Sequence, residues 1–369
     1  MKIALIGLPQ TGKKTVFSLL TGIGLDHLLG RAAEYHVGAV KVADPRVDKL
    51  SALYKPKRTK YAEIEVTLAP APPHETKPRE QWLNKLKTLD ALCQVVRAFD
   101  DASDPAREIE QMNLELTISD LSLIETRLDR IAQEQKKKFD QPRADEAALL
   151  GKLKPHLEAG KPLREYPWHE GEEKRVRSLQ FLTLKPLVTA FNGPTTSPHP
   201  SAARPASPPR GEAASEASGE GLTCRLDAKL ELEIAQIEDP RERAEFLAAL
   251  GIQEPAIHVL TRLLYKALGY ISFFTVWENE VRAWTLRHGE TALDAAHTIH
   301  TDLARGFIRA EVMKYDDLIA ALGTGLPAEA LAKAGHKAEV QLKETGKLHL
   351  KGKDYVVEDG DIVHIRHSG

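Results

Sequence analysis

Residues 7–15 read Gly7-Leu8-Pro9-Gln10-Thr11-Gly12-Lys13-Lys14-Thr15 and directly follow the apolar run 3–6. A glycine, four residues, a second glycine and a lysine form the pattern of a P-loop, which connects a strand to a helix. The glycines let the backbone turn its N–H groups toward phosphate oxygens, and the helix adds the positive end of its dipole. The stretch predicts a nucleotide-binding site in which Lys13 reaches the β- and γ-phosphates. The alternative is a structural glycine turn between strand and helix.

The last position of the motif departs from the pattern, because Lys14 stands where a serine or threonine is expected. That hydroxyl normally coordinates Mg²⁺, and a protonated lysine cannot coordinate a cation. Thr15 is the next hydroxyl along the chain, but it lies one residue further on, about 100° around the helix axis. Thr15 is therefore the candidate metal ligand that remains, and Mg²⁺ is in doubt as a cofactor. In a second interpretation, the Lys14 ammonium neutralises phosphate without a metal.

Length and composition narrow the class of protein. A chain of 369 residues predicts two or three domains. With 51 basic and 53 acidic residues, no overall field favours nucleic acid. Two cysteines imply no disulfide framework and fit a reducing compartment. No apolar stretch approaches the roughly 20 residues that span a bilayer, and the first strand is not preceded by a signal peptide. We therefore expect a cytoplasmic protein without a membrane partner.

Short apolar runs alternate with helical patterns from residue 1 to about 107, which favours a parallel α/β sheet. The expected strands are 2–6, 39–42, 63–68 and 91–99, and the expected helices are 13–20, 45–53 and 79–89. A further strand is expected at 186–191.

The region from 108 to 178 has a different pattern, in which apolar residues recur at helical spacing. Two such stretches, ending near 131 and 157, predict a hairpin of antiparallel helices. Residues 193–221 are rich in proline, serine and glycine without apolar periodicity, which predicts a disordered insertion. The pattern is helical from 225 to 268. From about 273 onward it indicates short strands with one helix at 291–303.

Several segments together resemble the YchF type of Obg-like P-loop ATPases. They begin at the P-loop and continue through 44–50, 95–99, 182–186, 274–275, 280–285, 299–302, 306–311 and 352–355. The resemblance covers nearly the whole chain and implies an α/β fold in three parts. These are a P-loop nucleotide-binding domain at 1–107 and 179–272, an inserted α-helical hairpin at 108–178, and a β-grasp (ubiquitin-like) module called TGS at 273–369. It also implies association with ribosomes and a preference for ATP over GTP.

The segment before switch II departs from the family pattern, which ends in Asp-x-x-Gly. The resemblance gives that carboxylate a role in the Mg²⁺ shell and the glycine N–H a role in sensing the γ-phosphate. Here Thr67 replaces the aspartate and Pro70 replaces the glycine. Since proline has no N–H to donate, neither function is retained at these positions.

Two further positions differ from those that the resemblance assigns to catalysis and base recognition. Gln94 stands where the family has a catalytic histidine; a glutamine orients water in other GTPases, so Gln94 is the candidate catalytic residue. Asn192 begins the base-recognition motif Asn-x-x-Glu, but Thr195 replaces its glutamate. The bound nucleotide is therefore ATP or GTP, without a sequence basis for choosing between them.

Three hypotheses follow. The first is a protein that binds ATP or GTP through residues 7–15 and Asn192, acts at the ribosome or ribosomal RNA, and has weakened or lost hydrolysis. The second is a slow ATPase or GTPase whose metal site is rebuilt with Thr15 and Gln94. The third is an interaction scaffold that binds no nucleotide. Two basic runs, at 55–60 and 135–138, offer contacts for RNA phosphates, although such runs usually form only a solvated face.

Overall fold

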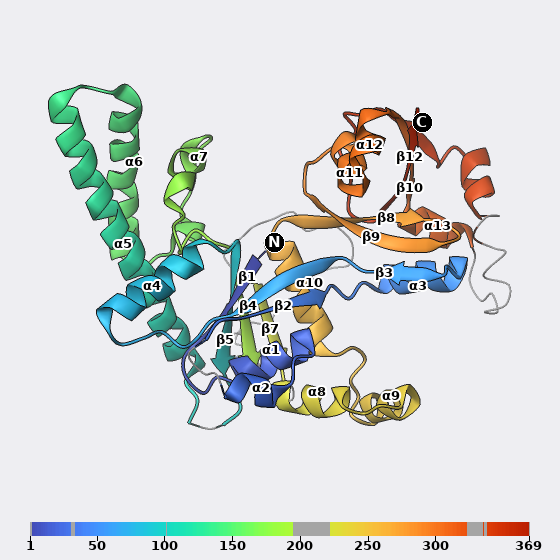
Figure 1. The fold of residues 1–369 in the computed structure, drawn as a ribbon, viewed down its shortest axis with the longest axis horizontal. Coiled ribbons are helices and arrows are strands. Elements are labelled where there is room, and N and C mark those ends of the chain that lie inside the picture. The colour runs from blue at the N-terminus through green and yellow to red at the C-terminus, as the bar shows by residue number, and fades with distance from the viewer. Residues whose placement is uncertain are drawn as a thin grey trace, which may run out of the picture. The chain divides into compact units, whose positions relative to one another are not determined.

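The computed structural model describes residues 2–30, 34–100, 102–194, 222–322, 335 and 338–368. The chain divides into two compact units (Figure 1). The first comprises 1–38 and 65–264, and the second comprises 39–64 and 265–369. Thr195 and the rest of the predicted insertion up to 221 lie outside the described residues.

The first unit is built on a six-stranded sheet with the order β2-β4-β1-β5-β6-β7. Its strands are β2 (His36–Lys41), β4 (Glu63–Leu68), β1 (Lys2–Ile6), β5 (Ala91–Arg97), β6 (Leu187–Asn192) and β7 (Leu222–Leu226). The pairs β1–β4, β1–β5, β5–β6 and β6–β7 are all parallel. The central strands are apolar on both faces and therefore buried, as parallel strands covered by helices are. The predicted α/β class is confirmed.

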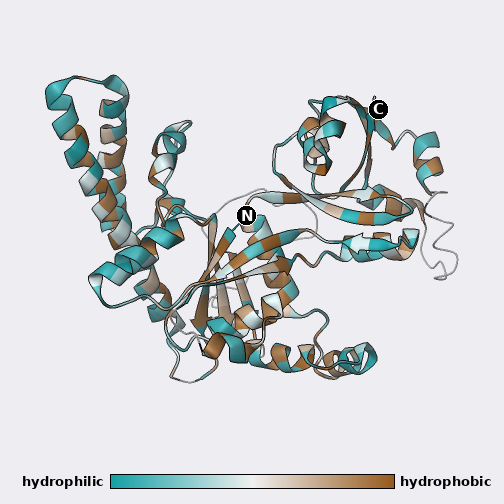
Figure 2. Cartoon of the chain, viewed as in Figure 1, coloured by the Kyte–Doolittle hydropathy of each residue, from teal (hydrophilic) through white to brown (hydrophobic). Residues whose placement is uncertain are grey.

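Helices cover the sheet of the first unit. Trp82 and Leu86 of α4 (Thr76–Lys87) pack with Met112 and Leu116 of α5 (Pro105–Lys137) against Ala4, Ile6 and Leu92. The unit also contains α1 (Lys13–Thr21), α2 (Leu25–Leu29), α8 (Ala228–Ala235), α9 (Pro240–Ala249) and α10 (Ala256–Ala267), the last of which extends past the unit boundary. Figure 2 shows hydrophobic residues concentrated in the sheet strands, and hydrophilic residues over much of the outer surface of α5 and α6.

The predicted helical hairpin is formed by α5 and α6 (Gln141–Glu158) (Figure 1). Ile124 and Ile131 of α5 pack with Leu150 and Leu153 of α6. The hairpin is followed by η1 (Leu163–Glu165), α7 (Glu172–Val176) and η2 (Arg177–Leu179).

Asp120 of α5 is fully buried and anchors the hairpin to the segment before β6. Its two carboxylate oxygens accept hydrogen bonds from the backbone N–H of Leu182 at 2.9 Å and from the backbone N–H and hydroxyl of Thr183, both at 2.7 Å. Three donors compensate for the burial of this side chain, which is otherwise costly.

The second unit is built on another six-stranded sheet, with the order β11-β10-β12-β8-β9-β3. The C-terminal strands are β8 (Tyr270–Val276), β9 (Glu280–Arg287), β10 (Phe307–Lys314), β11 (His349–Lys351) and β12 (Asp361–His367). Its helices include α3 (Pro45–Tyr54), α11 (Ala292–Ile299), α12 (Thr301–Arg305) and α13 (Tyr315–Ala321), and residues 338–344 are also helical. A core cluster around Phe273, Ala296 and Val363 joins α11 to one face of this sheet.

A segment from the N-terminal part of the chain completes this second sheet. Strand β3 (Arg58–Lys60) pairs in parallel with residues 280–282 of β9. Arg46 of α3 contacts Asp359 at 2.7 Å, and its guanidinium lies 5.0 Å from the ring centroid of Phe274. The segment between β2 and β4, residues 42–62, is therefore an integral part of the second unit.

One local expectation was wrong, and two elements were missed. The predicted helical region was to begin at 225, but residues 225–226 belong to β7, because 222–226 pair with β6 as an additional parallel strand. Strand β3 was not anticipated, and neither was α13. Within the described part of the chain, no helix has both the length and the apolar character needed to cross a bilayer.

Candidate phosphate-binding site

The loop between β1 and α1 has the backbone conformation that its glycines predict. Gly12, which precedes α1, has φ 84°, and Gly7, which follows β1, has φ 152°. Gln10 is also left-handed, with φ 63°. A positive φ at Gly12 is inexpensive only without a Cβ atom. The loop therefore turns sharply before α1 and leaves the N-terminal backbone N–H groups of this helix facing outward along its axis.

Asn192 at the end of β6 holds this loop in place. Its Nδ2 donates to the carbonyl oxygen of Thr11 at 3.0 Å, and its Oδ1 accepts from the backbone N–H of Ala228 at 3.1 Å. A Cβ atom on Gly12 would lie only 2.1 Å from this Nδ2. The position of Gly12 therefore favours glycine for two reasons. Its φ is positive, and the Asn192 side chain occupies the place where a Cβ atom would lie.

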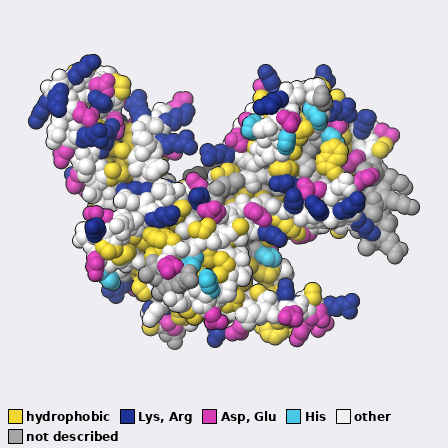
Figure 3. All heavy atoms as spheres, viewed as in Figure 1, with side chains coloured by type: hydrophobic (Ala, Val, Ile, Leu, Met, Phe, Trp, Pro, Cys, Tyr) yellow, Lys and Arg dark blue, Asp and Glu magenta, His cyan; other side chains and the backbone are white. Residues whose placement is uncertain are grey.

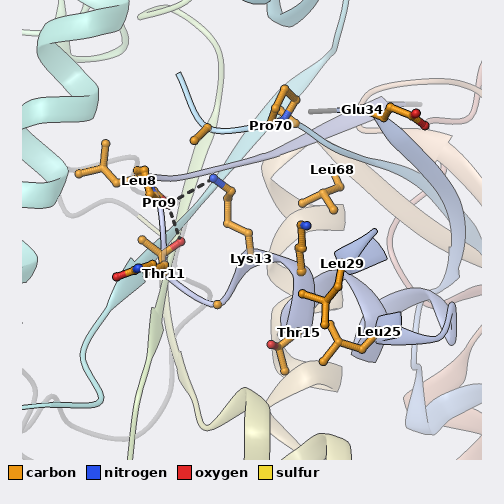
Figure 4. Close-up of a pocket in the computed structure, with 15 residues that line it drawn as sticks. Leu8, Pro9, Thr11, Lys13, Thr15, Leu25, Leu29, Glu34, Leu68 and Pro70 are labelled. Carbon is orange, nitrogen blue, oxygen red and sulfur yellow. Dashed lines mark hydrogen bonds between the residues drawn. The ribbon is translucent and has the colours of Figure 1, made fainter. Parts of the chain in front are cut away.

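Lys13 is the first residue of α1, and its side chain turns back over the loop (Figure 4). Its ammonium donates to the carbonyl oxygen of Gly7 and, at 3.3 Å, to that of Leu8. The side chain is buried, and this desolvation together with the charge of Lys14 lowers the pKa of Lys13 to about 8. The lysine of the motif is therefore positioned at the loop by two carbonyl groups rather than extended into solvent.

Lys14 is half-buried, and its ammonium donates to the carbonyl oxygen of Leu28 in α2 at 2.8 Å. This hydrogen bond fixes the direction of a side chain that would otherwise be flexible. Thr15 is also half-buried and lies one residue further along α1.

A cavity of about 420 Å³ lies over the loop and is formed entirely within the first unit. It is lined by all of residues 8–15, by Leu25 and Leu29 of α2, by Glu34, and by residues 68–71 (Figure 4). The lining is largely apolar, with the two lysine side chains as its basic groups. Figure 4 shows the carboxylate of Glu34 turned away from Lys13, and Glu34 is exposed.

The structure brings most predicted site residues together at this cavity. Gly7 belongs to the same loop and contacts Lys13, although it does not line the cavity itself. Asn192 acts on the loop through Thr11. Leu25, Leu29 and Glu34 were missed by the sequence analysis, because α2 is only five residues long and its contribution depends on packing beside α1 rather than on any motif.

Gln94 is not brought to the cavity. It lies in β5, is 1% exposed, and its Nε2 donates to the carbonyl oxygen of Glu108 at 3.3 Å. Its Oε1 has no hydrogen-bond partner. The candidate catalytic side chain is thus enclosed between the sheet and α5 in this structure.

The residues around the loop do not fit a Mg²⁺ ion bound in the usual P-loop manner. Lys14 stands at the position of the hydroxyl ligand, and Thr67 at the position of the carboxylate is 2% exposed within β4. Pro70 lines the cavity but has no N–H to offer a phosphate. Among the described residues there is no group of three or more histidine, cysteine, aspartate or glutamate side chains that could hold a metal ion.

Comparison with known proteins gives a consistent result along the chain. A family model named YchF-GTPase_C and described as "Protein of unknown function (DUF933)" matches residues 270–368. The chain is 37% identical to the "Ribosome-binding ATPase YchF" of Bacillus subtilis, with 98% of each chain covered. It is 34% identical to the protein of the same name from Escherichia coli O157:H7, again over 98% of each.

A solved structure supports the same assignment. The Schizosaccharomyces pombe YchF GTPase aligns with a TM-score of 0.76 and 25% sequence identity, covering 99% of this chain and 97% of that one. The sequence comparisons and the structural comparison thus point to the same family over nearly the full length of the chain. The chain belongs to the YchF family.

Proposed function

We propose that this chain binds the phosphates of ATP or GTP in the cavity over the P-loop, acts at the ribosome, and hydrolyses nucleotide weakly or not at all. The observation that carries the proposal is the position of Lys13, whose ammonium is held against the loop carbonyls beside a cavity of about 420 Å³. Residues 8–15 supply the backbone N–H groups and the start of α1 that favour a bound phosphate.

The weakened hydrolysis follows from the residues at the positions that usually serve the metal ion and the γ-phosphate. Electrostatic partners at a transition state contribute about 10²–10³ each to the rate. Pro70 cannot donate a backbone hydrogen bond, and Gln94 of β5 is enclosed against α5. Lys14 and Thr67 do not supply the metal ligands of a working P-loop hydrolase.

The proposed ribosomal partner is supported by the names of the relatives, which are called ribosome-binding ATPases. It is also supported by the hairpin, where basic residues gather at the free end of α5 and α6 (Figure 3). Lys136, Lys137 and Lys138 stand there beside Phe139, which is 69% exposed. Lysines of this kind bind RNA phosphates by releasing counterions. In this proposal the protein is cytoplasmic, and residues 273–369 are the TGS module.

A second candidate function is a slow ATPase or GTPase with a rebuilt metal site. It is favoured by one observation, namely that Thr15 lines the cavity. In this version Mg²⁺ accelerates phosphate release, and a Thr15→Val variant loses that acceleration while a Thr21→Val control at the far end of α1 keeps it.

The proposal is tested by calorimetric titration with ATP and with GTP, followed by measurement of phosphate release. We expect binding of at least one nucleotide, its loss in Lys13→Ala, and phosphate release close to the uncatalysed rate. Absence of binding to either nucleotide contradicts the proposal and leaves the scaffold hypothesis. Cosedimentation with ribosomes, compared with a variant in which Lys136, Lys137 and Lys138 are alanine, tests the proposed partner separately.

A further inference from the structure

The phosphate site of this chain carries two ammonium groups on consecutive residues. A nucleoside triphosphate such as ATP brings several negative charges into a P-loop, where the motif lysine and a Mg²⁺ ion together neutralise them. Here Lys13 is retained, but the two positions that would supply Mg²⁺ ligands hold Lys14 and Thr67. Unless another cation takes the place of the metal, the phosphates are only partly neutralised in a cavity whose lining is mostly apolar.

Lys14 has the properties that such a cation requires. Its side chain lines the cavity, and it is half-buried rather than extended into solvent. The hydrogen bond to the carbonyl oxygen of Leu28, at 2.8 Å, uses one of the three ammonium protons and leaves two for other acceptors. The charge of Lys14 also contributes to the lowered pKa of Lys13, as expected for two ammonium groups that are electrostatically close.

The carboxylates around the cavity do not offer an alternative metal site. Glu34 is exposed and turned away from Lys13 (Figure 4), and Thr67 is enclosed within the sheet. A Mg²⁺ ion placed beside Lys14 would face a positive charge instead of an oxygen ligand. Hard divalent cations select carboxylate, carbonyl and water oxygens, so this environment excludes the usual metal position.

We propose that the Lys14 ammonium replaces Mg²⁺ as the counter-charge in the P-loop, so that this site takes the metal-free polyphosphate of a nucleotide. The inference rests on the proposed nucleotide binding and specifies the form of the ligand. It adds a positioning role for the carbonyl of Leu28, which holds Lys14 at the cavity and links the phosphate site to α2. The site would therefore not require the magnesium complex on which other P-loops depend.

The test compares the affinity for fluorescent ATP and GTP in millimolar Mg²⁺ and in EDTA. For the unaltered protein we expect dissociation constants that agree within about threefold in the two conditions, since the protein itself supplies both positive charges. Lys14→Ser, which restores the motif residue, should weaken binding in EDTA by about tenfold to a hundredfold, the usual effect of losing one charge-assisted hydrogen bond.

A matched control removes a positive charge elsewhere in the same unit. Lys229 is exposed on α8 and does not line the cavity, so Lys229→Ser should bind as the unaltered protein does. Melting temperatures of all variants establish that they are folded. The inference is overturned if the unaltered protein needs Mg²⁺ to bind, or if Lys14→Ser binds as tightly in EDTA as the unaltered protein. Failure of the unaltered protein to bind in both conditions contradicts the proposed nucleotide binding itself, and with it this inference.

Discussion

The side chain of Asn192 joins the P-loop to the far end of β6 and to the start of α8. Its Nδ2 donates to the carbonyl oxygen of Thr11 at 3.0 Å, and its Oδ1 accepts from the N–H of Ala228 at 3.1 Å. Asn192 is 7% exposed, so neither backbone group has ready access to water as a substitute partner. One amide therefore fixes three segments that are far apart in the sequence.

Asn192→Ala should lower both stability and nucleotide affinity. Each backbone group left unpaired costs about 1–3 kcal/mol when buried. Urea unfolding should show a loss in this range, and the titration should show weaker binding because the loop is no longer held. Asn192→Asp keeps an acceptor for Ala228 but turns a carboxylate oxygen toward the carbonyl oxygen of Thr11, so it should be at least as destabilising as Asn192→Ala. Equal stability of Asn192→Ala and the unaltered protein would mean that this amide does not hold the loop.

Gly12→Ala should disrupt the loop for two separate reasons. The residue has φ 84°, and its new Cβ atom would lie 2.1 Å from Asn192 Nδ2. Gly22, which ends α1, provides the matched control, since it has φ 72° and no atom within 4 Å of the Cβ position. Gly22→Ala should cost about 1 kcal/mol from backbone strain alone. Gly12→Ala should cost clearly more, measured by thermal unfolding, and should lose nucleotide binding; similar costs for the two variants would contradict the close approach.

Nucleotide affinity should fall as the pH rises above neutrality. Burial lowers the pKa of Lys13 to about 8, so the free protein loses this charge well below the usual range for lysine. A bound phosphate favours the charged form, so binding requires proton uptake above pH 8 and weakens by up to about tenfold per pH unit. Between about pH 7 and pH 9 the dissociation constant should rise about tenfold. Lys13→Arg stays charged throughout, and its profile should be flat if it binds at all.

The lowered pKa of Lys13 also affects how stability changes with pH. The change has the opposite sign to that produced by a salt-bridged lysine, whose pKa is raised on folding. Between about pH 8 and the ordinary lysine pKa of 10.5, the unfolded chain retains the Lys13 proton and the folded chain does not. The unfolded state then binds more protons, so stability should rise with pH across this window. Lys13→Met should remove this rise from the pH dependence of urea unfolding.

Arg46 and Asp359 should be coupled within the second unit. The Arg46 guanidinium contacts Asp359 at 2.7 Å and Asp44 at 2.8 Å, and Asp359 also accepts from the backbone N–H of Ser272 at 2.8 Å. Asp359 is half exposed, so a double-mutant cycle should give a coupling of only about 1 kcal/mol. Arg46→Lys should not preserve it, because an ammonium cannot bridge both carboxylates in the same way. A coupling near zero would show that this ion pair does not help to hold α3 in the second unit.

Much of the N-terminal part of the chain could be predicted from local sequence. Strands β1 and β4 and helices α1 and α3 coincide with the expected ranges to within one residue. These elements have clear local signals, such as the glycines of the loop and the Asp44-Pro45 start of α3, where the Asp44 side chain accepts from the N–H of Arg46. The helical hairpin was predictable because its apolar spacing extends over many turns.

Other features depend on distant pairing and could not be predicted locally. Strand β3 consists of three exposed residues, and it is a strand only because β9 offers hydrogen-bonding partners. Residues 222–226 alternate between apolar and polar side chains, but over only five residues, and pairing with β6 makes them a strand. Gln94 was placed near the site by its position in a motif. In β5, however, both faces are buried, so a polar residue is enclosed whichever face it takes.

The most direct test of the central claim is the titration of the unaltered protein and Lys13→Ala with fluorescent ATP and GTP, each in Mg²⁺ and in EDTA. We predict saturable binding of at least one nucleotide by the unaltered protein in both conditions, and its loss in Lys13→Ala. If neither nucleotide binds, or if Lys13→Ala binds as tightly as the unaltered protein, the P-loop cavity is not the phosphate site that its geometry indicates.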